Sequence, residues 1–225
     1  MRKIFILLLL VPITLWAYSC NNGGNDPQKK ELKVLVVGNS ITYHPPAPEL
    51  GWNGDWGMAA TAPDKDFESL LHKKLSDAGK YKIQFTARNI AYWENDFHYD
   101  LNQFSDISGK TYDILIVRLG ENVNEKGPEF SNYEQELIKM INHFKSKNTK
   151  VIITGTVWPS PVKDSIQQKV AKDNGYYYIP LLDFQAEPKN YSYGKFANEQ
   201  VSGHPSDFGM ATIADKLYKQ VIAIY

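Results

Sequence analysis

Apolar and polar positions along the chain follow two alternating patterns, which together predict a layered α/β domain. From Leu32 onward, short aliphatic runs of strand character are separated by stretches whose apolar residues have helical spacing. We expect five strands, over residues 33–37, 82–87, 113–119, 150–154 and 176–182. Helical crossovers between successive strands are right-handed and give a parallel sheet. The predicted fold is therefore a three-layer α/β/α sandwich with a five-stranded parallel sheet.

Four helices complete this pattern. They are expected over residues 67–78, from Ser131 to about residue 144, over residues 164–172, and from residues 206–207 to about residue 221. Gly79 follows the first helix, and glycine is the usual helix terminator. Ser131 and Glu134 have the spacing of a capping box, which predicts where the second helix begins. Two long loops, residues 43–62 and 90–110, follow strands at the edge of the sheet where α/β domains bind their ligands.

The first twenty residues differ from the rest of the chain. Arg2 and Lys3 precede an apolar segment, residues 4–17, which is short for a bilayer span and has the length of a signal-peptide core. The only cysteine, Cys20, follows small residues at the end of this segment, as in a bacterial lipoprotein cleavage site. Ordinary secretion without lipidation is the alternative. We expect a signal peptide over residues 1–19, a polar lipidated tether over residues 20–31 and one folded domain over residues 32–225. The protein would then be exported and lipid-anchored in the cell envelope, on a membrane face that the sequence does not specify.

Length and charge narrow the range of partners. The chain has 225 residues with 43% hydrophobic content, which suits one well-buried domain. Lysine and arginine total 25 and balance the 25 aspartates and glutamates, and no basic run stands out. Nucleic acid is therefore not an expected partner, and a neutral or polar small molecule or polysaccharide is favoured.

Three short motifs carry candidate chemistry. Gly38-Asn39-Ser40 follows the first strand, Gly120-Glu121-Asn122 follows the third, and His204-Pro205-Ser206 precedes the last helix. Serine needs a histidine within hydrogen-bond reach and donors for the developing oxyanion before it can attack an ester. The first motif alone is also ordinary turn and cap composition, so its interpretation depends on the other two. Ser206 and Asp207 are expected to cap the last helix.

In this order and context the three motifs resemble those of the SGNH (GDSL-like) hydrolases, a likeness that covers the chain from about Leu32 to its end. The resemblance implies a flavodoxin-like fold, Ser40 as nucleophile and His204 as general base. It also implies that the Ser40 backbone amide and the Asn122 side chain donate to the oxyanion. Ala91 stands where the family has a glycine whose backbone amide is a third donor, and Gly120 completes the expected catalytic set.

The third member of a triad is not evident. The family places an aspartate three residues before its histidine, where this chain has Val201. Glu199, Asp183 and Glu121 are candidate acids. A serine–histidine dyad oriented by a backbone carbonyl is an equal alternative, because the third member holds the imidazole and takes no proton.

Aromatic residues suggest a substrate class. Trp52 and Trp56 lie in the loop after Ser40, and Trp93 and Trp158 follow strands at the same edge. Indole faces beside polar groups commonly hold sugar rings, although any one of these tryptophans could instead close the core beneath a long loop. His44 is near Ser40 in sequence and is a further substrate-binding candidate, with an exposed loop residue as the equal alternative.

These observations lead to one functional hypothesis and two alternatives. The histidines are scattered and there is no cysteine pair, so we expect neither a metal site nor a cofactor. The leading hypothesis is a serine esterase that hydrolyses an acyl ester, such as an O-acetyl group, on a carbohydrate. The alternatives are a weakened or inactive family member that binds glycan, and acyl transfer by the same residues.

Overall fold

The computed structural model describes residues 29–225, so the predicted signal peptide, Cys20 and most of the tether lie outside the described residues. Five strands form one parallel sheet in the order β2-β1-β3-β4-β5. Their bounds are β1 (Glu31–Gly38), β2 (Lys82–Asn89), β3 (Ile114–Arg118), β4 (Lys150–Thr154) and β5 (Tyr177–Ile179). The prediction of a five-stranded parallel sheet is confirmed.

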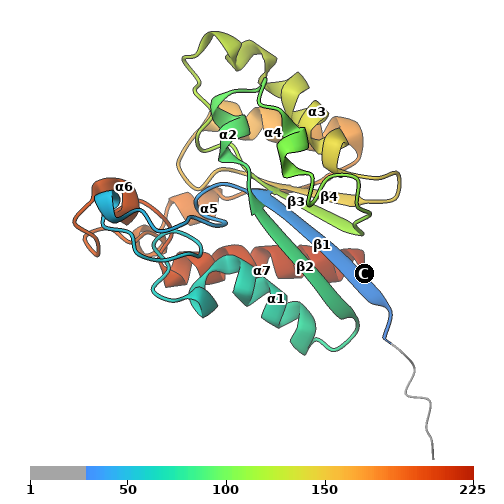
Figure 1. Ribbon diagram of the computed structural model, residues 1–225, viewed down its shortest axis with the longest axis horizontal. Coiled ribbons are helices and arrows are strands. Elements are labelled where there is room, and N and C mark those ends of the chain that lie inside the picture. The colour runs from blue at the N-terminus through green and yellow to red at the C-terminus, as the bar shows by residue number, and fades with distance from the viewer. Residues whose placement is uncertain (1–28) are drawn as a thin grey trace, which may run out of the picture.

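Helices cover both faces of this sheet (Figure 1). Their bounds are α1 (Phe67–Asp77), α2 (Ala91–Asn95), α3 (Tyr133–Phe144), α4 (Pro161–Asn174), α5 (Leu182–Gln185), α6 (Glu199–Ser202) and α7 (Asp207–Ile224). Helices α1 and α7 pack together on one face, and α3 and α4 pack on the other. The three layers of the predicted α/β/α sandwich are therefore present. Within residues 29–225, no helix combines the length and the apolar character needed to cross a membrane.

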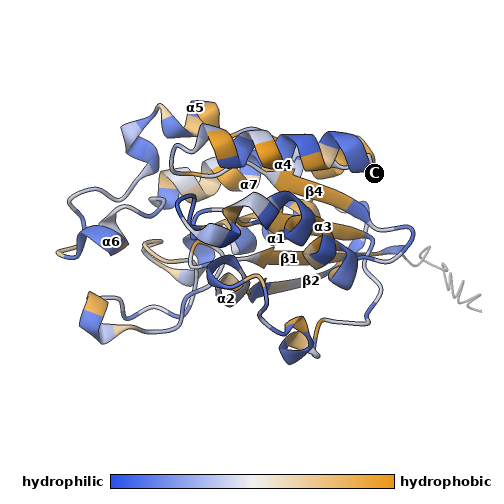
Figure 2. Cartoon of the chain, turned by 90° about the horizontal axis from the view of Figure 1, so that it is seen from above, coloured by the Kyte–Doolittle hydropathy of each residue, from blue (hydrophilic) through white to orange (hydrophobic). Residues whose placement is uncertain are grey.

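Strand β1 is the centre of both core layers. Val34 and Val36 join the cluster beneath α1 and α7, whereas Leu35 and Val37 join the cluster beneath α3 and α4. All four side chains are fully buried, and each contributes about 1.5–3 kcal/mol of burial free energy. In Figure 2, β1 and β4 are coloured mainly as hydrophobic, whereas the helices carry both hydrophobic and hydrophilic residues. This burial fixes the position from which the chain leaves the sheet at Gly38.

The predicted strands and helices are present, with boundaries that differ by up to three residues. The capping box at Ser131 is wrong, because that residue lies in a 3-10 turn (Pro128–Asn132) and α3 begins only at Tyr133. Helix α4 begins earlier than predicted, at Pro161, because the Ser160 side chain accepts a hydrogen bond from the Lys163 amide and caps it. Strand β5 is shorter than predicted, since its chain turns away from the sheet after Ile179.

The long loops gather beyond the carboxyl ends of the strands, as predicted. The turn after β1 requires glycine, since a Cβ at Gly38 would lie 1.8 Å from Thr42 Oγ1. The following loop, residues 43–62, encloses its own apolar cluster, which we call the loop cluster: Ala47, Trp52, Met58, Ala59 and Val201. Val201 comes from α6, so this cluster joins the loop after β1 to the segment that precedes α7. The loops that carry Ser40 and His204 are thus packed against each other.

Candidate active site

Ser40 and His204 meet at the carboxyl edge of the sheet. Ser40 Oγ lies 2.8 Å from His204 Nε2, although the residues are 164 positions apart in the chain. His204 Nδ1 lies 2.7 Å from the backbone carbonyl oxygen of Gln200. A carbonyl oxygen only accepts hydrogen bonds, so Nδ1 carries the proton and Nε2 presents its lone pair to the serine hydroxyl. The imidazole is therefore held in the tautomer that a general base needs.

The three candidate acids do not contact this histidine. Glu199 is exposed at the start of α6, and Asp183 pairs with Lys216 at 2.7 Å on the surface. Glu121 lies among other buried groups and accepts a hydrogen bond from Arg118 Nη1 at 2.6 Å. Within residues 29–225, no carboxylate hydrogen-bonds to His204. The prediction of a carboxylate partner is wrong for all three residues, and the backbone-carbonyl alternative matches the observed geometry.

Val201, at the position where the family has an aspartate, has a structural role. Its side chain is fully buried in the loop cluster. This packing anchors α6 against the loop after β1 and thereby fixes the Gln200 carbonyl that faces His204. An apolar residue at position 201 is thus consistent with a base that is oriented by the backbone.

Burial also sets the protonation state of His204. His204 is 6% exposed, and burial lowers its pKa from 6.5 to about 4, opposed by the hydrogen bond to Gln200 and assisted by the nearby charge of His44. Trp158 packs edge-on against the ring at 5.4 Å and donates from Nε1 to the Gly203 carbonyl oxygen at 2.9 Å. The imidazole is consequently neutral at neutral pH and able to accept a proton.

Asn122 lines the same cavity as Ser40 and is held by Glu94, which was not among the predicted site residues. Its Nδ2 donates to Glu94 Oε2 at 2.7 Å. The other oxygen of Glu94, Oε1, accepts from the Gly120 amide at 2.5 Å. Glu94 lies on α2 and is fully buried. The only sequence signal for it was an acidic residue close after Ala91, in a loop already rich in carboxylates.

A second buried carboxylate extends this network. Asn39 Nδ2 donates to Glu121 Oε2 at 2.8 Å and lies 3.4 Å from Glu94 Oε1. Glu121 also accepts from Arg118 and from the Val157 amide. Burial, and then the charge of Glu121, raises the pKa of Glu94 from 4.5 to about 7, while its hydrogen bonds oppose the shift. The residue before the candidate nucleophile is thus tied to both carboxylates.

Two of the expected oxyanion donors keep free hydrogens. The Ser40 amide donates to no acceptor among the described residues, and Asn122 Nδ2 has a second hydrogen besides the one given to Glu94. The Ala91 amide, in contrast, donates to Asn89 Oδ1 at 2.8 Å, so the prediction of a free third donor there is wrong. Gly120 has a supporting position, because its amide is used by Glu94 and its φ of +126° suits only glycine.

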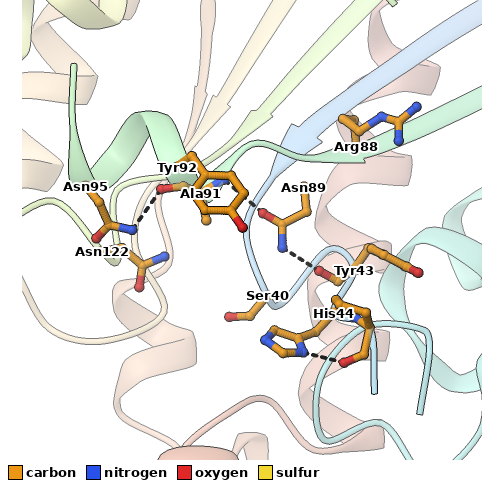
Figure 3. A pocket seen from close by; sticks show the side chains of 10 residues that line it. Ser40, Tyr43, His44, Arg88, Asn89, Ala91, Tyr92, Asn95 and Asn122 are labelled. Atoms are coloured by element: carbon orange, nitrogen blue, oxygen red, sulfur yellow. Dashed lines mark hydrogen bonds between the residues drawn. The ribbon is translucent and has the colours of Figure 1, made fainter. Parts of the chain in front are cut away.

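Ser40, Ala91 and Asn122 line one open cavity of about 450 Å³. Figure 3 shows Asn122 and Tyr92 on one side of Ser40, and His44 and Tyr43 on the other. The full lining consists of Ser40, Tyr43, His44, Pro45, Arg88, Asn89, Ala91, Tyr92, Asn95 and Asn122. His44 Nδ1 lies 2.6 Å from the Pro45 carbonyl oxygen, which leaves its Nε2 free to meet a ligand. The predicted contact of His44 with substrate is therefore sterically available.

None of the four predicted tryptophans lines this cavity. Trp52 and Trp93 are 3% and 1% exposed and belong to apolar clusters, so their predicted role as sugar platforms is wrong. Trp56 donates from Nε1 to Ala60, and Trp158 covers His204. Burying the indoles of Trp52 and Trp93 stabilises the two long loops.

Tyrosines supply the exposed aromatic surface instead. Tyr92 is 68% exposed and stacks on Tyr99 at 5.4 Å, and Tyr43 is 41% exposed. Both line the cavity. Their places beside Ala91 and close after Ser40 were the available sequence signal. Across residues 29–225, no group of three or more histidine, cysteine, aspartate or glutamate side chains is arranged to hold a metal ion.

Comparison with known proteins gives similarity at the level of the fold. No protein-family model matches the chain, and a search of curated proteins finds no match. Among solved structures, TesA is similar with a TM-score of 0.59 and 18% identity over 86% of this chain and 99% of that chain. The acetyl xylan esterase AlAXEase has a TM-score of 0.56 and 20% sequence identity, over 84% of this chain and 100% of that chain. The psychrotrophic esterase EstA from Pseudoalteromonas sp., inhibited by monoethylphosphonate, has a TM-score of 0.57 and 14% sequence identity, over 85% of this chain and 97% of that chain. The chain therefore has the α/β fold of these proteins, as its resemblance to SGNH hydrolases predicted.

Proposed function

We propose that this protein is a serine esterase that hydrolyses a short acyl ester on a polar alcohol. The observation that carries the proposal is the 2.8 Å contact between Ser40 Oγ and His204 Nε2, with Asn122 on the same cavity. Esterases with the same fold support it. No long apolar channel is needed for a short acyl group, and polar side chains such as Asn89 and Asn95 are among the cavity residues.

The mechanism follows from these contacts. Ser40 Oγ attacks the acyl carbon while its proton moves to His204 Nε2, and the carbonyl oxygen becomes an oxyanion that accepts from the Ser40 amide and Asn122. The tetrahedral intermediate collapses, the bond to the alcohol breaks, and His204 gives the leaving alcohol its proton. Water then attacks the acyl-serine with His204 again as base, which releases the acid and restores Ser40. The Gln200 carbonyl stabilises the transient imidazolium less than a carboxylate would, so turnover should be slower than that of a full triad.

The proposed substrate is an O-acylated carbohydrate, with acetyl as the favoured acyl group. Exposed Tyr92 and Tyr43 offer ring faces beside polar groups, which suits a sugar ring with its mixed apolar and hydroxyl surfaces. A structurally similar protein is named as an acetyl xylan esterase. Acyl transfer to a sugar uses the same residues and differs only in the acceptor, so product analysis with and without added sugar distinguishes the two reactions.

Direct substitution tests the enzyme. We expect Ser40→Ala and His204→Ala to lower kcat on aryl acetates by about 10³-fold or more, because the nucleophile and its base act together. A serine-reactive phosphonate should label the wild-type protein at Ser40. The exposed Ser165→Ala and His72→Ala variants provide matched controls that keep full activity. Absence of both labelling and aryl acetate hydrolysis in the folded wild-type protein would refute the esterase function.

A glycan-binding protein without hydrolytic activity is the second candidate. The observation that favours it is the absence of a carboxylate partner on His204 among the described residues. It predicts oligosaccharide binding that Ser40→Ala leaves unchanged, with no ester cleavage by the wild-type protein. Equilibrium binding and acetate release measured on the same acetylated oligosaccharide distinguish this candidate from the esterase.

We further propose that the protein is exported and anchored in the cell envelope through a lipid on Cys20. This proposal rests on the sequence of residues 1–20. Metabolic labelling with a fatty acid should mark the wild-type protein, and Cys20→Ser should abolish the label and shift the protein to the soluble fraction. Equal fractionation of both forms would contradict it.

A further inference from the structure

The buried carboxylate of Glu94 lies behind Asn122 and outside the cavity that contains Ser40. We propose that Glu94 is a positioning residue that holds the Asn122 carboxamide with its nitrogen toward the oxyanion; this rests on the esterase function proposed above. The juxtaposition is specific: one Glu94 oxygen meets Asn122 Nδ2 at 2.7 Å, and the other meets the Gly120 amide at 2.5 Å.

The chemistry of the two groups supports this assignment. A carboxamide has a donor end and an acceptor end of nearly the same shape, and rotation by 180° exchanges them. An ionised carboxylate only accepts hydrogen bonds, so the atom of Asn122 that faces Glu94 must be the nitrogen. The second hydrogen of that nitrogen is then available to the cavity. A flipped Asn122 would instead place its oxygen beside the developing oxyanion and repel it.

The surroundings of Glu94 prevent the carboxylate from moving. Its Oε1 accepts from the Gly120 amide and lies 3.4 Å from both the Asn122 amide nitrogen and Asn39 Nδ2. Asn39 is itself fixed by Glu121, with Arg118 on the far side. These contacts hold the Glu94 carboxylate in one place, and it therefore holds Asn122 in one orientation.

Protonation of Glu94 should release this hold. A neutral carboxylic acid carries a donor hydrogen and can satisfy either orientation of the carboxamide. The charged and titratable groups near Glu94 are Arg118 at the end of β3, Glu121 after that strand, and Tyr133 on α3. Asp96 and Glu129 line a second cavity together with Glu94. Burial and the charge of Glu121 raise the pKa of Glu94 to about 7, so the carboxylate forms as the pH rises through neutrality. The base His204, with its pKa lowered to about 4, is already neutral in that range.

The test compares the pH dependence of kcat in the wild-type protein and three variants, with an aryl acetate as substrate. We expect wild-type kcat to rise with pH through about pH 7. Glu94→Gln should lower kcat by about tenfold to hundredfold with little change in KM, because oxyanion donors act in the transition state, and should remove this rise. Asn122→Ala should also remove it, and adding Glu94→Gln to Asn122→Ala should cost nothing further.

Asp100→Asn is the matched control. Like Glu94, Asp100 is a carboxylate that accepts a hydrogen bond from an asparagine: Asn102 Nδ2 donates to its Oδ1 at 2.8 Å. Asp100 lies on an exposed loop, and the substitution removes one negative charge there. It should keep the wild-type kcat and the wild-type pH profile. Circular dichroism at each pH reports whether every variant is folded.

The outcomes separate this proposal from the esterase function. A wild-type protein that is folded but neither hydrolyses aryl acetate nor is labelled at Ser40 refutes the enzyme and this proposal with it. An active wild-type protein whose pH rise persists unchanged in Asn122→Ala, or a folded Glu94→Gln variant with wild-type kcat, overturns the positioning role alone. If Glu94→Gln does not fold, the comparison of wild type with Asn122→Ala still decides the question.

Discussion

At the scale of single residues, the orientation of His204 depends on a backbone atom. The Gln200 carbonyl oxygen lies 2.7 Å from Nδ1 and fixes the tautomer that a carboxylate would otherwise fix. Every residue has a backbone carbonyl, so no pattern of side chains can predict which one contacts the histidine. The motifs could therefore predict that Ser40, Asn122 and His204 lie at one edge of the sheet, whereas the group that contacts His204 Nδ1 depends on the backbone path of α6. Val201 was the visible clue, since an apolar residue at the expected acid position excludes the usual triad.

Restoring the acid should fail. We expect Val201→Asp to lower the free energy of unfolding by several kcal/mol, because it buries a carboxylate in the loop cluster without a partner. It should also lower kcat, because a displaced α6 takes the Gln200 carbonyl away from His204. Chemical denaturation and aryl acetate kinetics measure both effects.

Val162→Asp is the control for this substitution. The Val162 side chain is 51% exposed on the first turn of α4, so the same change should leave stability within about 0.5 kcal/mol. A Val201→Asp variant with wild-type stability and higher kcat would show instead that position 201 can act as the acid.

At the scale of elements, periodicity succeeded where elements are long and fully packed. Buried β1 and the amphipathic α1 and α7 were predicted within a few residues, because their patterns record burial directly. Helix α2 has only five residues and no side-chain cap, so no pattern revealed it. Glu94 lies on that helix, and its role could not be predicted from residue type because solvated glutamates are far more common than buried ones.

The N-cap of α7 lies two residues after His204. Ser206 Oγ accepts from the Gly209 amide at 3.2 Å and donates to the Lys189 carbonyl oxygen at 2.6 Å, two residues after His204. We expect Ser206→Ala to cost about 1–2 kcal/mol of stability, as the loss of an N-cap usually does. It should also lower kcat, because the chain that leads into α7 carries the histidine.

The cap of α4 is a matched control for that substitution. Ser160 is buried, accepts from the Lys163 amide at 3.3 Å and donates to Glu125, and neither of these partners hydrogen-bonds to His204. Ser160→Ala should cost a similar amount of stability with little effect on kcat. Equal losses of kcat in both variants, measured with thermal unfolding on the same samples, would contradict a specific link between the α7 cap and His204.

At the scale of the whole molecule, the candidate site places two opposite pKa shifts in one buried region. Glu94 has its pKa raised from 4.5 to about 7, whereas His204 has its pKa lowered from 6.5 to about 4. A raised carboxyl pKa means that the folded protein binds more protons than the unfolded chain between these values, so this group loses stabilising effect as the pH rises from about 4.5 to 7. The lowered histidine pKa has the reverse sign, and its stabilising effect is lost as the pH falls from about 6.5 to 4.

Single variants should therefore reveal two hidden pH dependences that nearly cancel in the wild-type protein. Each shift corresponds to roughly 3 kcal/mol. As the pH rises from about 4.5 to 7, the Glu94 carboxyl destabilises the wild-type protein increasingly, and Glu94→Gln lacks this effect. Glu94→Gln should therefore gain stability relative to wild type by up to that amount. As the pH rises from about 4 to 6.5, the buried neutral imidazole of His204 stabilises the wild-type protein increasingly, and His204→Gln lacks this effect. His204→Gln should therefore lose stability relative to wild type over this range. Urea unfolding across this range measures both differences, and two variants whose curves run parallel to wild type would show that these groups titrate alike in the folded and unfolded states. Opposite slopes would mean that the pH dependences of Glu94 and His204 offset each other in the free energy of unfolding. Burying both groups at the sheet edge then changes the stability of the wild-type protein little between mildly acidic and neutral pH.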